Sequence, residues 1–254
     1  MLKEREPLRL IDRARWLWDT TFPAGGWHFV DARFLAMRVH VDERAANRIL
    51  PGGLRMAKPA MATLFVAKFP ESRAVGDAYE EAGLFLHVER RGTPGIHCPW
   101  ILVSDDIALI LGRDVLGYPK KLGRVDFSID GDNARAIVER KGDRIFEVSA
   151  KLGAVDPHPP PMEDIPTYNV IGPVGARLQW LVRFRAKEEI MESRRADASL
   201  SVRWAERDPI AELRFGEVES AHYYRIKLGG ARPPIPLRPV GPRFYTYNWS
   251  LRSR

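Results

Sequence analysis

The sequence is poor in cysteine and contains no long apolar run. The single cysteine, Cys98, excludes an internal disulfide among the 254 residues and is expected to be a small buried hydrophobe. Because no run of about 18 apolar residues occurs, we expect no transmembrane helix. Charged residues interrupt every apolar stretch of residues 1–18, so we expect no signal-peptide core there. We therefore expect a cytoplasmic protein with no membrane partner.

Metal-binding and nucleotide-binding signatures are also missing. The six histidines show no spacing typical of metal ligands, so we expect no metal. Glycine-rich phosphate-binding loops and the GxSxG nucleophile motif are absent. The net charge of +7 suggests a nucleic-acid partner, but the 31 arginines and nine lysines are scattered along the chain among acids and form no basic block. A solvated basic surface is the better interpretation, and no nucleic-acid partner is expected.

Length and composition are typical of one soluble globular domain, with 45% hydrophobic and 29% charged residues. We expect a single domain over residues 1–254. Within it, residues 1–26 are expected to form an N-terminal helix, at 8–18, and a turn-rich loop. The proline-rich segment 156–161 is expected to be a stiff surface connection, and residues 229–254 an extended tail laid over a surface.

Short strand-like runs recur along the chain between turn signals. GDN at 131–133 and KGD at 141–143 each separate two alternating runs, as in β-hairpins. Asp42 is expected to cap a short helix that ends near Leu50. We expect an α+β fold, predominantly antiparallel β, as a barrel or sandwich with a few short helices. The expected strands are 34–41, 61–69, 84–90, 96–103, 107–111, 124–130, 134–141, 144–151, 176–184, 199–204 and 222–228.

The most informative stretch is GRDVLGYPKKLG, residues 112–123. It follows the apolar run 107–111, which is expected to be a buried strand. Its adjacent lysines, Lys120 and Lys121, are compatible with two solvated side chains at a turn. Burial and a neighbouring cation, however, lower the pKa of a lysine, and the neutral amine can then form a Schiff base with a ketone. The imine itself is the electron sink, so this chemistry implies no cofactor.

This stretch closely resembles the signature of the acetoacetate decarboxylase superfamily. WHFVDARFLAMRVHVDERAANRILPGGL, from Trp27, and DAYEEAGLFLHV, from Asp77, are similar to the same family. The similarity continues to about Leu228. It implies the barrel or cone fold of that family and assembly into a homotetramer or a larger homo-oligomer.

The resemblance also assigns roles to individual residues. Lys120 corresponds to the Schiff-base nucleophile, and Lys121 to a second lysine whose charge matters less than burial. Glu81 corresponds to a pocket glutamate that moves protons or orients the substrate. A register slip of one residue would exchange it with Glu80.

The sequence departs from the decarboxylase pattern at several positions. Ala32 stands where decarboxylases carry an arginine, and Arg33 is a candidate substitute one residue away. A second family glutamate falls at Leu64, and the C-terminal residues GPRFYTYNWSLRSR also differ. Similar departures occur in branches of the superfamily that act on pyruvate. We therefore expect a pyruvate aldolase-dehydratase-type branch rather than a true acetoacetate decarboxylase.

Three further residues are candidates for the pocket of such an enzyme. Tyr245 or Tyr247 would shuttle a proton at the aldehyde oxygen, with Glu81 as the base, although aromatic residues of a tail more often pack against a protein surface. Trp100 would line the pocket, although it is equally compatible with ordinary core.

Three functions follow, in order of preference. The first is a Schiff-base-forming lyase on 2-oxo acids, which condenses pyruvate with an aldehyde and removes water, or hydrates an unsaturated 2-oxo acid. The second is a decarboxylase of acetoacetate or a related β-keto acid. The third is a non-catalytic barrel that binds a small ligand. The expected partners are therefore a small 2-oxo or β-keto acid and an aldehyde.

Overall fold

The computed structural model describes residues 27–72, 75–172, 179–229, 233–241 and 243–252, mostly as β-strand. The strands are β1 Phe29–His40, β2 Arg55–Met56, β3 Met61–Phe69, β4 Tyr79–Arg90, β5 Thr93–Val103, β6 Lys120–Leu122, β7 Arg124–Asp130, β8 Asn133–Arg140, β9 Asp143–Val155, β10 Thr167–Ile171, β11 Trp180–Phe184, β12 Lys187–Val202, β13 Val218–Gly229 and β14 Ile235–Pro239. The helices are α2 Glu43–Ile49, α3 Asp106–Leu116, the 3₁₀ turn η1 Ile210–Leu213 and α4 Arg243–Arg252. Within these ranges, no helix is long and apolar enough to cross a membrane.

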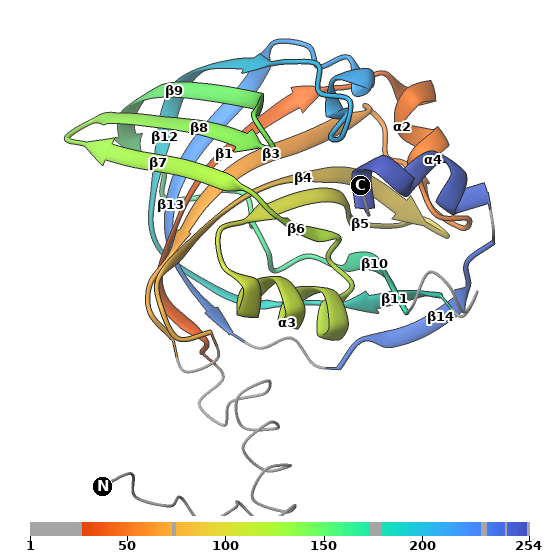
Figure 1. Cartoon of the computed structure of the whole chain (residues 1–254). Helices are drawn as coiled ribbons and strands as arrows, with labels where there is room; N and C mark the ends of the chain where they lie inside the picture. The colour runs from red at the N-terminus through yellow and green to blue at the C-terminus, as the bar shows by residue number, and fades with distance from the viewer. Residues whose placement is uncertain (1–26, 73–74, 173–178, 230–232, 242, 253–254) are drawn as a thin grey trace, which may run out of the picture.

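The strands form one strongly curved sheet (Figure 1). Its hydrogen-bonded order is β14-β11-β10-β5-β4-β3-β1-β13-β12-β9-β8-β7, with β2 paired to β4 and β6 to β5. Most neighbouring strands are antiparallel, and β5 pairs in parallel with both β6 and β10. In the described part of the chain the sheet does not close, because the end strands β14 and β7 are not paired with each other.

The predicted fold class is confirmed: the chain is α+β, predominantly antiparallel, with a few short helices. The predicted turn between β8 and β9 has positive φ at Lys141 (54°) and Gly142 (89°), the backbone that a two-residue hairpin requires. Asp42 caps α2 as predicted, since its side chain accepts a hydrogen bond from the backbone N–H of Ala45 at 2.7 Å. The helix and loop expected over 1–26 lie outside the described residues.

Two local predictions were wrong. Residues 107–111, expected to be a buried strand, belong to α3, which Asp105 caps at its start and Gly117 ends in the left-handed conformation (φ 68°). The tail was expected to be extended over 229–254. Among its described residues, Ile235–Pro239 form β14, and Arg243–Arg252 form the helix α4. Once the prolines of the tail end, nothing opposes the i→i+4 hydrogen bonds of a helix.

Apolar side chains form a core on each face of the sheet. The first core holds alternate residues of β1, β3 and β4, together with side chains from α2, α4, η1 and β7 to β9. The second core holds the intervening residues of the same strands and is bordered by α3 and by the segment before β10. Each central strand is therefore buried on both faces, and the face on which a residue lies decides which core it enters.

Candidate active site

The two lysines of the motif lie on opposite faces of β6. Lys120 faces the second core, where its side chain lines a pocket. Lys121 faces the first core, where its amine contacts Asp208. Successive side chains of a strand alternate between faces, so sequence neighbours are separated by the sheet itself. Lys121 is therefore not a neighbouring charge on the pocket side of Lys120.

Lys120 forms a buried ion pair with Glu81 of β4. Both side chains are less than one-tenth exposed, at 8% and 6%. β5 lies between their strands and pairs with both, with Lys120 opposite Ile101 and Glu81 opposite Val103. The structure thus brings Lys120 and Glu81 together and places Glu81, rather than Glu80, in the pocket. A carboxylate in this position is able to take a proton from the amine.

The pocket around this pair has a volume of about 170 Å³ and mainly apolar walls. Many of these walls are aromatic rings, from Phe29, Phe65, Phe69, Tyr79, Phe85, Tyr118 and Phe184. Apolar surroundings disfavour the charged form of an amine unless an opposite charge is close, and here Glu81 supplies it. The pocket therefore combines one amine and its proton acceptor with space for a small organic molecule.

Tyr79 lies next to both members of the pair. The Lys120 amine lies 5.8 Å from the centre of its ring, and Phe69 stacks on the same ring with centroids 4.8 Å apart. Burial raises the pKa of the Tyr79 hydroxyl well above its ordinary value, and the charge of Glu81 raises it further. Tyr79 is therefore a neutral hydroxyl of the pocket wall.

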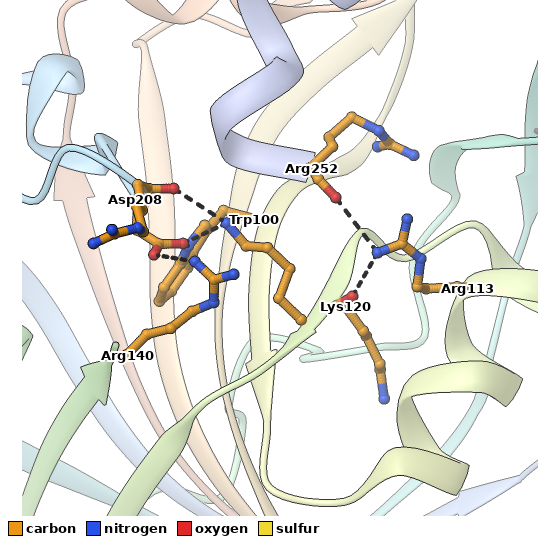
Figure 2. Close-up of polar contacts among 8 residues, drawn as sticks. Trp100, Arg113, Lys120, Arg140, Asp208 and Arg252 are labelled. Atoms are coloured by element: carbon orange, nitrogen blue, oxygen red, sulfur yellow. Dashed lines mark hydrogen bonds and ion pairs between the residues drawn. The ribbon is translucent and has the colours of Figure 1, made fainter. Parts of the chain in front are cut away.

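Helix α3 covers the stem of Lys120 with a glycine. A Cβ at Gly112 would lie 2.6 Å from both Cδ and Cε of Lys120, so a larger residue would require the lysine side chain to shift. The next residue, Arg113, donates through Nη1 to the backbone carbonyl of Lys120 at 2.9 Å and to that of Arg252 at 3.4 Å (Figure 2). Gly112 of the motif therefore allows α3 to pack closely on the Lys120 side chain. Arg113 connects β6 to the end of α4 through its two hydrogen bonds.

Glu163 is a pocket residue that the sequence analysis missed. It lies between β9 and β10, directly after the proline-rich segment that was expected to be a surface connection, and its side chain is buried in the pocket wall. Burial raises the pKa of Glu163 to about 8, and the charges of Glu188 and Glu81 act in the same direction. The alternation of buried strands could not reveal it, because it lies on no strand.

Trp100 does not line the pocket, contrary to prediction. It is buried in the first core, where its indole N–H donates to Asp208 at 2.7 Å. Leu84 pairs with Trp100 but Leu86 pairs with His97, so β5 contains one extra residue between these pairs. This bulge reverses the faces on which the following residues of β5 lie, and Ile101 rather than Trp100 faces the pocket. Trp100 is therefore a core residue, the alternative that the sequence had left open.

Asp208 is the centre of a second buried charge cluster. It contacts Lys121 and accepts from Arg140 at 3.0 Å, and Lys120 points away from this group (Figure 2). Burial alone would raise the pKa of Asp208, but the two cations hold it below its ordinary value. Burial lowers the pKa of Lys121 to about 8, against the attraction of Asp208. The cluster anchors β6 from the face opposite the pocket.

The positions that depart from the decarboxylase pattern lie as follows. Ala32 is buried in the second core, whereas Arg33 is exposed on the other face of β1 and donates to Asp31 at 3.0 Å. Arg33 is thus not a pocket residue. Leu64 belongs to the first core, and the pocket residue beside it in β3 is Phe65.

Tyr245 and Tyr247 lie in α4, and their side chains are outside the described part of the structure. The helix itself packs on the first core through Phe244 and Leu251. Among the described residues, no group of three or more His, Cys, Asp or Glu side chains is placed to hold a metal ion.

The sequence profile of the acetoacetate decarboxylase family matches residues 13–232. The chain belongs to this family. Among curated relatives, the acetoacetate decarboxylase of Streptomyces nogalater is 36% identical over 111 residues, which are 44% of this chain and 45% of that protein. The match therefore spans less than half the length of that relative.

Solved structures show the same fold. Acetoacetate decarboxylase from Legionella pneumophila superposes with a TM-score of 0.73 at 18% identity, over 93% of each chain. The enduracididine biosynthesis enzyme MppR, complexed with the condensation product of pyruvate and imidazole 4-carboxaldehyde, gives a TM-score of 0.70 at 23% identity. That comparison covers 82% of this chain and 88% of MppR.

Proposed function

We propose that the protein is a lysine-dependent lyase of small keto acids, with Lys120 as the Schiff-base nucleophile. The observation that carries the proposal is the buried pair of Lys120 and Glu81 at the wall of an aromatic pocket. A buried amine needs a partner that removes its proton before it can attack a carbonyl carbon, and Glu81 is in contact with it. Lys121 has a structural role, as the anchor of β6 in the first core.

The chemistry follows from these two side chains. Glu81 takes the ammonium proton, and the Lys120 nitrogen then attacks the carbonyl carbon of the substrate. Glu81 returns this proton to the hydroxyl of the carbinolamine, which leaves as water and gives a protonated imine. The Glu81 carboxylate formed in this way then removes a proton from the carbon next to the imine to give an enamine. The enamine is a carbon nucleophile held in a pocket with apolar walls, and the protein nitrogen supplies the electron sink.

We propose 2-oxo acids as the preferred substrates, with aldol condensation and loss of water, or the reverse hydration, as the reaction. Ala32 and Leu64 support this preference, because apolar residues stand at the two positions where the polar set for β-keto acid decarboxylation is expected, and the pocket residue beside Leu64, Phe65, is apolar too. The fold shared with MppR, whose complex holds a product of pyruvate and an aldehyde, supports it as well.

Decarboxylation of acetoacetate or a related β-keto acid is the second candidate. The curated relative that carries this name supports it. The apolar walls do so too, because a carboxylate in such a pocket is destabilised relative to neutral carbon dioxide. In this reaction the imine accepts the electron pair released by the leaving carboxylate, and the same Lys120 is required.

Intact-mass spectrometry after borohydride reduction separates these candidates. The wild-type protein is incubated with pyruvate and with acetoacetate in parallel, next to Lys120→Ala and the exposed-lysine control Lys68→Ala. We expect a reduced pyruvate adduct in the wild type and in Lys68→Ala, and none in Lys120→Ala. An adduct from acetoacetate alone, at the mass of its decarboxylated imine, would identify a decarboxylase.

The absence of any adduct would overturn the proposed function. The remaining interpretation would then be a binding protein whose pocket takes a small ligand without reaction.

The expected assembly into a homotetramer or a larger homo-oligomer stays a prediction. Size-exclusion chromatography with light scattering tests it.

A further inference from the structure

Glu163 places a second carboxyl at the pocket that holds Lys120 and Glu81. Its side chain is only 9% exposed, and Oε2 accepts a hydrogen bond from the Tyr118 hydroxyl at the long distance of 3.4 Å. Among the described residues, the Tyr118 hydroxyl is the one hydrogen-bond partner of the Glu163 carboxyl group. A carboxyl buried in an apolar wall is costly unless it is well paired. One long hydrogen bond does not account for keeping an acid there.

The loop that carries Glu163 is clamped so that this side chain turns inward. Glu188, at the start of β12, accepts from the backbone N–H of Glu163 at 2.6 Å and from that of Met162 at 3.1 Å. The Met162 side chain is buried in the second core. The two hydrogen bonds from the backbone of Met162 and Glu163 to the Glu188 carboxylate fix the backbone at Glu163. The Glu163 side chain is therefore held in the pocket wall.

The neighbourhood of Glu163 favours its protonated form. With its pKa raised to about 8 by burial and then by Glu188 and Glu81, the group carries a proton at neutral pH. The titratable groups that interact with Glu163 electrostatically are Tyr118 before β6, Cys98 on β5, Tyr79 and Glu81 on β4, Lys120 on β6 and Glu188 on β12. Lys120 is already paired with Glu81. The pocket therefore contains one carboxyl beside the amine and another that carries a donatable proton.

We propose that Glu163 is the proton donor of the pocket, which protonates the enamine carbon formed on Lys120. This inference rests on the proposed Schiff-base function. In the step, the carbon–carbon π pair of the enamine forms a new C–H bond with the Glu163 proton. The nitrogen lone pair becomes the π bond of the iminium, and Glu163 is left as a carboxylate that water reprotonates. Decarboxylation and the reverse aldol reaction both require this step.

Methyl-proton exchange in D₂O tests the assignment apart from imine formation. The exchange of pyruvate and of acetone is followed by proton NMR for the wild type, Glu163→Gln and Glu163→Asp. The matched control is Asp164→Asn, which removes the next carboxylate of the loop, an exposed one paired with Arg185. Borohydride trapping is run on every variant, because an adduct requires a folded pocket and an active Lys120.

We expect Glu163→Gln to keep the trapped adduct and to lose exchange by about 100-fold or more, the usual contribution of a positioned acid. Glu163→Asp should recover part of the rate, and Asp164→Asn should behave as the wild type. The wild-type rate should also fall as the pH rises through 8, and this limb should be missing in Glu163→Gln.

Two results would overturn the inference while the proposed function stands. One is exchange by Glu163→Gln within threefold of the wild type. The other is loss of adduct and exchange together in both Glu163 variants, which would show that the residue only supports the wall. A wild type that traps no ketone would instead refute the proposed function, and this inference with it.

Discussion

Lys120 and Lys121 are adjacent in the sequence, but their amines contact different carboxylates on opposite faces of β6. Lys120 pairs with Glu81 at the pocket, and Lys121 pairs with Asp208 in the first core. The two lysines of the motif therefore have different roles within one short strand. One residue reacts under our proposal, and the other fixes the strand from behind.

This division predicts opposite phenotypes for two matched substitutions. Lys120→Met should abolish the borohydride adduct. Lys121→Met should keep the adduct but lower the free energy of unfolding by about 3 kcal/mol, because it breaks a buried ion pair. Urea denaturation and intact-mass spectrometry measure the two properties on the same samples. A Lys121→Met protein of wild-type stability that forms no adduct would contradict the structural role.

Gly112→Ala should impair Lys120 although alanine favours helices. The added Cβ would meet the lysine stem at 2.6 Å, so the amine must move. A displacement of about 1 Å in a reacting group can lower a rate on the order of 100-fold, and we expect adduct formation to slow by about this factor. Ile110→Ala, at an exposed position of the same helix, is the control. Equal trapping rates in both variants would disprove the predicted clash.

Acid should destabilise the protein through His97. Burial lowers the pKa of His97 to about 3, whereas an unfolded histidine titrates near 6.5. Below pH 6.5 the unfolded chain therefore binds a proton that the folded chain excludes, and stability falls as the pH falls. The loss should reach about 2 kcal/mol at pH 5.

His97→Gln, which keeps a donor for the Tyr168 carbonyl, should flatten this pH dependence. The measurement is urea denaturation between pH 7.5 and 5. A variant with the same slope as the wild type would show that other groups dominate the acid response.

Glu163→Gln should stabilise the protein increasingly as the pH rises. A carboxyl whose folded pKa is raised to about 8 binds a proton that the unfolded chain has already lost above pH 4.5, so wild-type stability falls across this window. The difference between variant and wild type should grow by roughly 3–5 kcal/mol between pH 5 and 8.5. Paired denaturation curves at these two pH values measure it, and a constant difference would contradict the raised pKa.

Several parts of the fold followed from the sequence because they depend on local rules. The hairpin at Lys141-Gly142 and the cap of α2 by Asp42 are examples. The error at 107–111 shows the limit, since a five-residue apolar run fits a strand or a helix equally well. Asp105 and Gly117, at cap positions on either side, were the signals that favour the helix.

The site was predictable where the motif carries it and unpredictable where the tertiary fold assembles it. Lys120 and Glu81 followed from family resemblance, and the structure brings them together. Trp100 was misplaced because a register shift reverses the faces of β5. Glu163 was missed because a loop residue enters the pocket only through its contact with Glu188, a partner distant in the sequence.

The hydrogen-bond ladders that join β4, β5 and β6 position the Lys120–Glu81 pair independently of much of the pocket wall. Ladder register sets the spacing of Lys120 and Glu81, whereas α3, β11 and the segment before β10 supply much of the wall. Apart from Gly112 and Glu163, the wall residues of those elements can change the shape of the space without moving the amine from its carboxylate. Under the proposed function, a lineage with this architecture can therefore change the compound it accepts through a few wall residues and keep the same amine and carboxylate.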